Sequence, residues 1–574
     1  MTTEKRPIPI GLDDFKQIRE NNYFYIDKTF LIKEILSSGS SVTLFTRPRR
    51  FGKTMNMSML QYFLDCNIPS SKALFEGLKI AQEHAGFCSQ HMNKCPVIFV
   101  SFKDILYENK VDFYLKLNNY ISNIYNKFRY LLDSKTTSPE QREWFSTLLA
   151  GKADASLLEV SLMRLTMLLE QHHGVKPFLL IDEYDVPIHS AFHNGQYEDC
   201  IKFMKVLYGS ALKGNTHLNK GVMTGILRVA KESIFSGLNH LDVASVVSYN
   251  YPNFFGITEQ ELKNLLVDYR VESQCESVKN WYNGYQFGQN TTIYNPWSIL
   301  NWLHNGHQFN PYWLNTSSND LVRSLFFAHK EKLQEIIFKL LSGENVKIRL
   351  SEDLHFPSLQ TNCSNEDYLT LLLHSGYLTT RNEEFLQNRY WYTLSIPNEE
   401  IRIIFSDMMD MWLKQIAPNL QENMSLIILN SLRNNDLKTF ETHFSNVVLQ
   451  VMSYHDFAEQ PENAFHCFTA GFLSWLSHEY EVRSNRETGE GRADILLLPK
   501  NNSLPGYVFE LKAYRPKKEP KKLPLAGIKN KLNLALKQIE EKNYEAEFKS
   551  RNIAKVTKIA MVFYKKKVWF KTNS

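Results

Sequence analysis

The sequence has few cysteines and no arrangement of them that would build a covalent or metal-bound framework. Its 574 residues include seven cysteines, scattered at positions 66, 88, 95, 200, 275, 363 and 467 without a C-x-x-C pair. Paired spacings are typical of zinc sites and of disulfide-rich secreted domains. The sequence therefore predicts neither and favours reduced cysteines in a protein core.

Long apolar runs are also missing. No stretch approaches the roughly 20 apolar residues that a membrane-spanning helix needs, and residues 1–10 lack the apolar segment of a signal peptide. We therefore expect a cytoplasmic protein with no membrane partner. The composition, with 43% hydrophobic and 22% charged residues, is typical of a globular chain, and the length predicts several domains.

Acidic residues become scarce toward the C-terminal end. From Lys500 to Ser574 the chain carries 19 lysines and arginines against six glutamates and no aspartate, a net charge of +13. Since the whole chain carries +5, the first 499 residues sum to −8. A basic segment on an acidic body indicates a polyanionic partner, and we expect DNA. A lysine-rich solvated surface is the alternative that charge leaves open.

The segment 47–54, Arg-Pro-Arg-Arg-Phe-Gly-Lys-Thr, lacks the first glycine of a phosphate-binding loop but keeps the end of its pattern. It follows an apolar strand pattern at 41–46 and precedes a helical pattern at 55–64, which is the context such a loop needs. The glycine allows close backbone approach, the lysine supplies charge, and the threonine hydroxyl suits Mg²⁺. A basic surface loop is the alternative. The loop residues that we expect to bind ATP are Arg49, Arg50, Gly52, Lys53 and Thr54.

Two further strand patterns end in polar residues that suit the same site. Residues 177–181 deliver Asp182, expected to hold Mg²⁺ with Thr54, and Glu183, expected to polarise the attacking water. Residues 221–227 place Thr224 where a sensor residue would lie, and Arg228 within reach of a γ-phosphate. A buried strand with a polar exit is the alternative for the first strand, and an ordinary polar strand residue is the alternative for Thr224 and Arg228.

The strand patterns alternate with helical ones, which predicts an α/β fold with a parallel sheet covered on both faces. The order of the strands at 41–46, 97–101, 177–182 and 221–227 suits an ASCE-type NTPase sheet. In the aromatic block at 281–288 we expect packing beneath this domain, with Asn295 as N-cap and Pro296 as first residue of the next helix.

A second cluster lies near the C-terminal end. The strand patterns at 491–498 and 507–512 are joined by a turn, so Asp494 and Glu510 are predicted side by side, with Lys512 on the face of Glu510. Two carboxylates can hold Mg²⁺ or Mn²⁺, and the ammonium can orient water or stabilise phosphate charge. We expect both acids at strand edges and outside the apolar core. An exposed acid and a surface lysine are the alternative.

These motifs together resemble those of the bacterial predicted AAA-ATPase family, many of whose members end in a PD-(D/E)xK nuclease-like domain. The resemblance covers nearly the whole chain. It is carried by residues 47–54, Ile-Asp-Glu-Tyr-Asp at 181–185, Thr-Gly-Ile at 224–226, Ser-Gly-Leu-Asn at 236–239, Tyr-Asn-Pro-Trp-Ser at 294–298, and the C-terminal hairpin. In this family arginine in place of the first loop glycine is usual.

The resemblance implies three regions and further site residues. The regions are an AAA-ATPase-like P-loop domain at 1–310, a helical and winged-helix-like region at 311–455 and the nuclease-like domain at 456–574. Glu462 matches the acidic position on the first nuclease helix, and Gln538 falls in a helical Q-x(5)-Y motif that supports the site or approaches DNA. The segment containing Tyr-Ile-Asp-Lys-Thr at 25–29 leads into the loop and is expected to cover the nucleotide base.

The sequence therefore predicts an ATP-binding, ATP-hydrolysing protein that controls a metal-dependent DNA endonuclease domain. The alternative is a nucleotide-dependent switch whose nuclease-like domain binds nucleic acid or protein without cutting, as a defence factor or secreted effector. The hairpin expected from residues 376–380 and 390–395 has few basic residues, so we expect it to pack against protein and not DNA. The sequence is compatible with an oligomer.

Overall fold

The computed structural model describes residues 5–227, 241–313, 322, 325–326, 332–351, 354, 359, 364–416, 424–451, 461–474, 476, 479–488, 491–516, 522–541 and 546–573. Its contacts divide the chain into two compact units. The first comprises residues 1–321 and 349–392, and the second comprises residues 322–348 and 393–574. Arg228 lies outside the described residues.

A five-stranded parallel sheet forms the centre of the first unit. Its strands are β1 (Val42–Thr46), β2 (Val97–Ser101), β3 (Phe178–Asp182), β4 (Lys220–Gly225) and β5 (Leu241–Ala244), in the order β2-β3-β4-β1-β5. β1, β3 and β4 are buried along their whole length, because helices cover both faces. β4 lies between β1 and β3, so the ends of all three strands meet. The predicted parallel sheet is confirmed.

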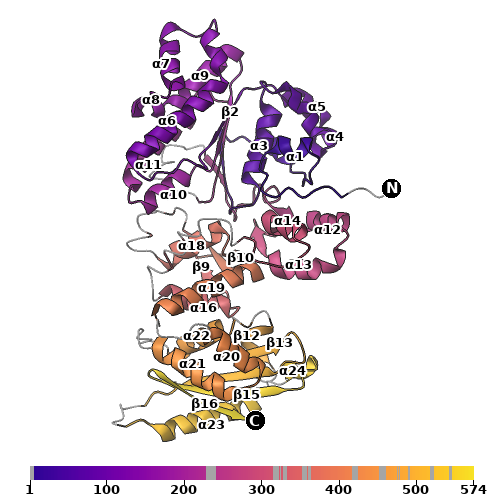
Figure 1. The fold of residues 1–574 in the computed structure, drawn as a ribbon, viewed down its shortest axis with the longest axis vertical. Coiled ribbons are helices and arrows are strands. Elements are labelled where there is room, and N and C mark those ends of the chain that lie inside the picture. Colours follow the sequence, from indigo (N-terminus) through magenta and orange to yellow (C-terminus); the bar gives the residue numbers. More distant parts are fainter. Residues whose placement is uncertain are drawn as a thin grey trace. The chain divides into compact units, whose positions relative to one another are not determined.

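Helices flank this sheet on both sides, with α1, α3, α4 and α5 on one side and α6 to α9 and α11 on the other (Figure 1). The helical stretch at 155–173 is divided into two helices, because Val160 adopts φ −110° and ψ 5°, outside the helical region. The α-helices of this unit are α1 (Phe15–Glu20), α2 (Phe30–Ser37), α3 (Lys53–Leu64), α4 (Lys79–Glu83), α5 (Ala85–His91), α6 (Lys110–Lys127), α7 (Pro139–Leu149), α8 (Ala155–Glu159), α9 (Ser161–His173), α10 (Val186–His193), α11 (Tyr197–Leu212), α12 (Glu259–Asp268), α13 (Cys275–Tyr282), α14 (Pro296–His304) and α18 (Asn365–Ser375).

A small sheet carries the aromatic block. It consists of β6 (Ile257–Thr258), β8 (Thr291–Tyr294) and β7 (Tyr285–Phe287), in that order. The Phe51 ring lies 5.1 Å from that of Tyr285 and 5.5 Å from that of Phe287, between ring centroids. The block therefore has the predicted packing role, and the structure adds that it packs against the loop at 47–54. The Asn295 side chain accepts the N–H of Trp297 over 2.9 Å, which confirms the predicted N-cap.

The predicted hairpin of the middle region is present as β10 (Thr379–Leu386) and β11 (Arg389–Ser395), and the division between the two units falls within β11. Gln387 and Asn388 form its turn with φ of +51° and +61°, the left-handed values that a tight hairpin turn requires. β10 runs six residues beyond the predicted end at 380. Along the chain α18 precedes the two strands and α19 (Glu399–Ile416) follows them.

A mixed five-stranded sheet forms the centre of the second unit. Its strands, in order, are β12 (Tyr480–Thr488), β13 (Gly491–Pro499), β14 (Gly506–Ala513), β15 (Val556–Tyr564) and β16 (Lys567–Asn573). β14 and β15 are parallel, and the other neighbours are antiparallel. The remaining elements of this unit are α16 (Lys332–Leu341), β9 (Val346–Ile348), α20 (Met424–Arg433), α21 (Leu437–Val451), α22 (Pro461–Leu473), α23 (Leu525–Glu541) and α24 (Ala546–Ser550).

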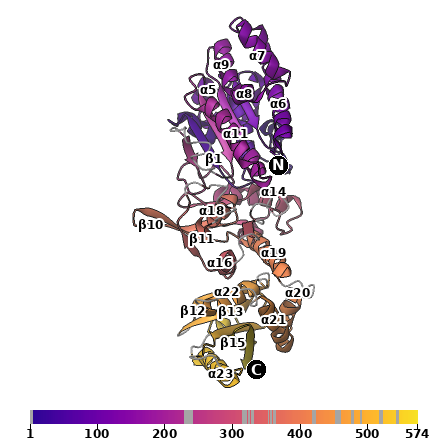
Figure 2. The same ribbon diagram turned by 90° about the vertical axis from the view of Figure 1, so that its left-hand side faces the viewer.

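Helices α20, α21 and α22 lie on one side of this sheet and α23 on the other (Figures 1 and 2). On the α23 side, Ile528 and Leu532 pack with Leu496, Val508 and Ala560 in one buried cluster. Within the described residues of both units, no helix is long and apolar enough to cross a membrane.

Candidate functional site

The loop at 47–54 has the backbone of an anion-binding loop. Gly52, with φ +82°, is the residue before α3, and this left-handed conformation favours glycine. Glycine offers no side-chain cap, so the first N–H groups of the twelve-residue helix are open to an anion. Lys53 Nζ donates to the carbonyl oxygens of Arg47 at 2.9 Å and Pro48 at 3.0 Å. Burial lowers the pKa of Lys53, and the carboxylates of the site oppose that shift.

Arg47, at the position of the missing glycine, points away from the phosphate side. Its side chain is fully buried, with Nη1 donating to the carbonyl oxygen of Ala244 at 2.6 Å and Nη2 to that of Tyr251 at 3.3 Å. The guanidinium also lies 5.2 Å and 5.0 Å from the ring centroids of Phe255 and Phe287. Burial lowers the pKa of Arg47 to about 9, which leaves it charged at neutral pH. Arg47 therefore anchors the loop to β5 and the chain that follows.

The other two loop arginines differ in their surroundings. The positive charge of Arg49 helps to lower the pKa of Glu183, against the larger raising effect of burial, so Arg49 lies near the acids of the site. The Arg50 guanidinium lies over the Trp297 ring of α14, 4.3 Å from its centroid. Arg49 therefore lies near the acids of the site, and Arg50 packs the loop against α14.

The predicted acid and hydroxyl residues meet at the ends of β3 and β4. Asp182 is fully buried, and its Oδ2 accepts from Thr54 Oγ1 at 2.8 Å while its Oδ1 accepts from the Thr224 hydroxyl. The N–H of Glu183 donates to Thr224 Oγ1 at 3.3 Å. Burial raises the pKa of Glu183, and its φ of +53° is unusual for a residue other than glycine. These hard oxygen groups fit Mg²⁺ completed by water and phosphate.

Sequence reasoning missed the third acid of the Ile181–Asp185 motif. Asp185 Oδ2 accepts the N–H groups of Ile226 at 2.8 Å and Leu227 at 3.1 Å, which fixes the end of β4 beside the end of β3. Gly225 is required there, because a Cβ would lie 2.5 Å from Cε1 of Tyr184. The signal in the sequence that could have indicated this role is an acidic residue two positions after Glu183. Its task is to align Thr224 with Asp182.

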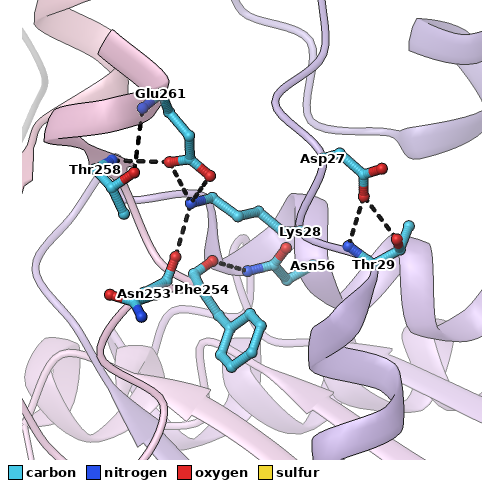
Figure 3. A network of polar contacts seen from close by, with 8 residues as sticks. All are labelled: Asp27, Lys28, Thr29, Asn56, Asn253, Phe254, Thr258 and Glu261. Carbon is cyan, nitrogen blue, oxygen red and sulfur yellow. Dashed lines mark hydrogen bonds and ion pairs between the residues drawn. The ribbon is translucent and has the colours of Figure 1, made fainter. Parts of the chain in front are cut away.

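The Tyr-Ile-Asp-Lys-Thr segment forms a polar network beside α3 (Figure 3). Lys28 Nζ donates to both carboxylate oxygens of Glu261 at 2.7 and 2.6 Å and to the carbonyl oxygen of Asn253 at 2.7 Å. Asn56, three residues after Lys53, donates to the carbonyl oxygen of Phe254 at 2.9 Å. The network therefore ties residues 253–261 to α3 and to the segment that precedes α2. Its expected contact with a nucleotide base stays a prediction.

The second cluster lies where β13 and β14 reach the end of their ladder. The register pairs Leu497 with Tyr507 and Ile495 with Phe509. Beyond these pairs, Asp494 Oδ2 accepts the N–H of Leu511 at 2.7 Å. Alternation along the strands puts Asp494, Glu510 and Lys512 on the α23 side of the sheet.

Glu510 and Lys512 form an ion pair on β14. Lys512 Nζ lies 2.7 Å from Glu510 Oε1, so the predicted placement of the lysine on the face of Glu510 is confirmed. The expected position of Glu510 at a strand edge is wrong. Its side chain is fully buried, because β14 is the central strand, with β13 on one side and β15 on the other.

The structure places the two supporting residues, Glu462 and Gln538, only by their helices. Position 462 lies in the first turn of α22, and its side chain is outside the described residues. Gln538 is partly exposed on α23, which packs on the side of the sheet that carries Asp494 and Glu510. The described residues contain no group of three or more His, Cys, Asp and Glu that could hold a metal ion. Two carboxylates on neighbouring strands still fit a divalent ion whose other ligands are water.

Comparisons with known proteins match both clusters to known families. A family model described as "Predicted AAA-ATPase" matches residues 9–235, and one described as "PD-(D/E)XK nuclease superfamily" matches residues 460–573. The chain is 25% identical over 558 residues to an "Uncharacterized protein in vnfD 5'region" of Azotobacter chroococcum mcd 1. That alignment covers 95% of this chain and 94% of the relative, so the similarity spans both clusters.

Proposed function

Because the chain carries a predicted AAA-ATPase family domain at its N-terminal end and a PD-(D/E)XK nuclease superfamily domain at its C-terminal end, we propose that it is a nucleotide-controlled, metal-dependent DNA endonuclease. In this proposal the first domain binds and hydrolyses ATP, and the nucleotide state regulates cleavage by the second.

The observation that carries the cleavage proposal is the placement of Asp494, Glu510 and Lys512 on one side of the sheet, within a domain of this superfamily. Asp494 and Glu510 would hold Mg²⁺ or Mn²⁺. A bound ion of this kind polarises a phosphate ester and lowers the pKa of a bound water. The N–H of Leu511 orients the Asp494 carboxylate. The Lys512 ammonium, now paired with Glu510, would orient the attacking water or stabilise charge on the phosphate.

The ATP site divides its tasks among the residues at the ends of β1, β3 and β4. Lys53 and the first N–H groups of α3 would bind the β- and γ-phosphates, assisted by Arg49. Thr54 and Asp182 would hold Mg²⁺. Glu183, close to Lys53 and half-buried, would take the proton of the attacking water. Thr224 would report on the γ-phosphate through its bond to Asp182.

DNA is the proposed partner of the second unit. The segment 500–574, which includes β14, α23, α24, β15 and β16, carries a net charge of +13. Lys565, Lys566 and Lys567 are exposed together at the turn between β15 and β16. Exposed lysines of this density suit a phosphate backbone.

The proposal is tested by incubating the full-length protein with supercoiled plasmid and Mg²⁺ or Mn²⁺, with and without ATP. We expect metal-dependent nicking or linearisation whose rate changes with ATP in the wild type and not in Lys53→Ala. Cleavage that is identical with and without nucleotide in both proteins would contradict nucleotide control. Absence of cleavage under every condition would contradict the nuclease assignment.

One observation favours a second candidate, a nucleotide-dependent switch that holds nucleic acid without cutting. Within the described residues the metal site offers two carboxylates, and Glu510 is already paired with Lys512. This candidate predicts DNA binding that responds to ATP, with no strand breaks at any metal concentration. The plasmid assay, combined with a DNA-binding measurement on the same preparation, separates the two candidates.

A further inference from the structure

A small polar cluster contacts the main-chain oxygen of Asp494, whereas the Leu511 N–H contacts its carboxylate. His466 of α22 is buried, and its Nε2 lies 2.8 Å from the main-chain oxygen of Asp494. Ser484 Oγ of β12 lies 3.1 Å from the same Nε2 and 3.2 Å from Glu344 Oε1. We infer that His466, held by Ser484 and Glu344, positions Asp494 for metal binding, an inference that rests on the proposed nuclease function.

The direction of the hydrogen bond follows from the chemistry of the two atoms. A main-chain carbonyl oxygen only accepts, so Nε2 of His466 carries the proton and donates it to Asp494. The Ser484 hydroxyl then donates to Glu344, and its oxygen shares the Nε2 proton. Nδ1 of His466 lies 3.8 Å from Glu344 Oε1, beyond hydrogen-bond distance. The ring is therefore held at Nε2, and Glu344 acts on it through the Ser484 hydroxyl.

The contact matters because it fixes Asp494 at a second point. The carboxylate is held by the Leu511 N–H through Oδ2, and the main chain is held by His466 through the carbonyl oxygen. A strand end held at both points keeps its carboxylate oriented without a metal present. Partners of this kind behind metal ligands typically contribute about 10- to 100-fold to metal affinity or activity. His466 also lies one helical turn after position 462 in α22, so it sets how that turn of the helix lies against β13.

The same cluster connects the site to the segment before it. Glu344 lies between α16 and β9, just after the C-terminal end of α16. That end is itself held from α19, because the Arg402 Nη1 donates to the carbonyl oxygen of Leu341 at 2.6 Å. Movement of α16 or α19 would therefore reach Asp494 through Glu344 and His466.

The test uses the full-length, nucleotide-free protein and Mn²⁺ as the probe, titrated by calorimetry. His466→Leu removes the donor at similar size, and His466→Gln places an amide donor near the position of Nε2. Ser474→Ala is the matched control, since Ser474 is buried just beyond α22 and its hydroxyl donates within its own turn, to the carbonyl oxygen of Gly471 at 2.6 Å. Asp494→Asn removes one proposed carboxylate ligand, so the Mn²⁺ binding that is lost in this variant is the binding at this site.

We expect His466→Leu to weaken Mn²⁺ binding about 10- to 100-fold, with His466→Gln and Ser474→Ala close to the wild type. Without metal, hydrogen exchange of the segment 506–513 should be faster in His466→Leu, because the Asp494 carboxylate no longer protects the Leu511 N–H. Equal Mn²⁺ affinity and equal exchange in His466→Leu and Ser474→Ala would overturn the inference while leaving cleavage by the wild type intact. If the wild type and Asp494→Asn bind Mn²⁺ equally, or neither binds it, the proposed nuclease function is overturned. The exchange measurement would then still decide whether His466 positions Asp494.

Discussion

Lys53 Nζ donates to the carbonyl oxygen of Arg47 over 2.9 Å, while the Arg47 side chain runs in the opposite direction, toward Ala244 and Tyr251. The loop thus separates two positive charges that are six residues apart in the sequence. The Lys53 ammonium contacts carbonyl oxygens of the loop itself, whereas the fully buried Arg47 guanidinium contacts carbonyl oxygens outside the loop. Nucleotide phosphates would take the Lys53 ammonium from the carbonyl oxygens and leave Arg47 in place.

Lys53→Ala should abolish measurable ATP binding. The ammonium is the strongest phosphate contact that the loop offers, and loss of such a buried charged contact costs about 2–5 kcal/mol, roughly 30-fold or more in affinity. Titration with a fluorescent ATP analogue measures the effect. Lys116→Ala, which removes an exposed lysine that pairs with Glu108 on the same unit, is the control. Equal affinity in wild type and Lys53→Ala would remove the phosphate-loop assignment.

Arg47→Gly restores the general loop pattern and should nevertheless destabilise the first unit. The change empties a buried space and leaves the carbonyl oxygens of Ala244 and Tyr251 without their donor, at a cost on the order of 2–4 kcal/mol. Thermal unfolding measures it. Arg50→Gly is the neighbouring control, because Arg50 has φ +67°, which glycine adopts without strain. An Arg47→Gly protein as stable as the wild type would show that the arginine is not an anchor.

Glu183→Gln should keep ATP binding and slow hydrolysis, because an amide cannot accept the proton of the attacking water. Burial raises the pKa of Glu183, and a general base works only when deprotonated. The hydrolysis rate of the wild type should therefore increase as the pH is raised through that pKa. On acidification the rate should already be low at pH values where an ordinary glutamate is still ionised. Steady-state kcat against pH checks this, with Glu198→Gln, an exposed residue of α11, as the control. A kcat that Glu183→Gln leaves unchanged would place the base elsewhere.

Local patterns in the sequence were enough to predict the elements that carry the sites. Apolar runs bounded by turn residues gave β1, β2 and β3 to within a residue or so, and helical spacing gave α3 with its observed C-terminal end at Leu64. Asp494 and Glu510 were found from two strands and one turn. These features depend on neighbours in the sequence, which is why one chain sufficed to find them.

The features that sequence reasoning missed depend on which distant segments meet. The inward direction of Arg47 is set by β5 and the chain after it, about 200 residues away. Glu510 is buried because β15, far along the chain, covers its second side. The bond from His466 to Asp494 joins two elements whose separate patterns show only a buried histidine and a strand acid. No local pattern encodes such a pairing.

DNA binding by the second unit should weaken steeply with salt. If six to ten phosphates are contacted, affinity should fall by about 10³ to 10⁵ between 50 and 200 mM salt. Replacing Lys565, Lys566 and Lys567 with alanine should lower the slope of log affinity against log salt by up to roughly 3. Fluorescence anisotropy of a labelled duplex measures both. The control replaces Lys103, Lys116 and Lys127 of the first unit, and an equal loss of slope in both proteins would place the DNA elsewhere.

Asp494→Asn and Glu510→Gln should remove cleavage of supercoiled plasmid and leave the fold intact. Asparagine Oδ1 can still accept the Leu511 N–H, and glutamine fills the buried space of Glu510, which alanine would leave empty. Loss of one carboxylate charge also relieves repulsion of phosphate, so DNA binding without metal should hold steady or tighten. Lys512→Ala should lose cleavage and keep most metal binding, because an ammonium is not a metal ligand. Glu541→Gln, an exposed change of the same kind on α23, is the control for charge alone. Plasmid cleavage that survives Asp494→Asn at the wild-type rate would assign the chemistry to other residues.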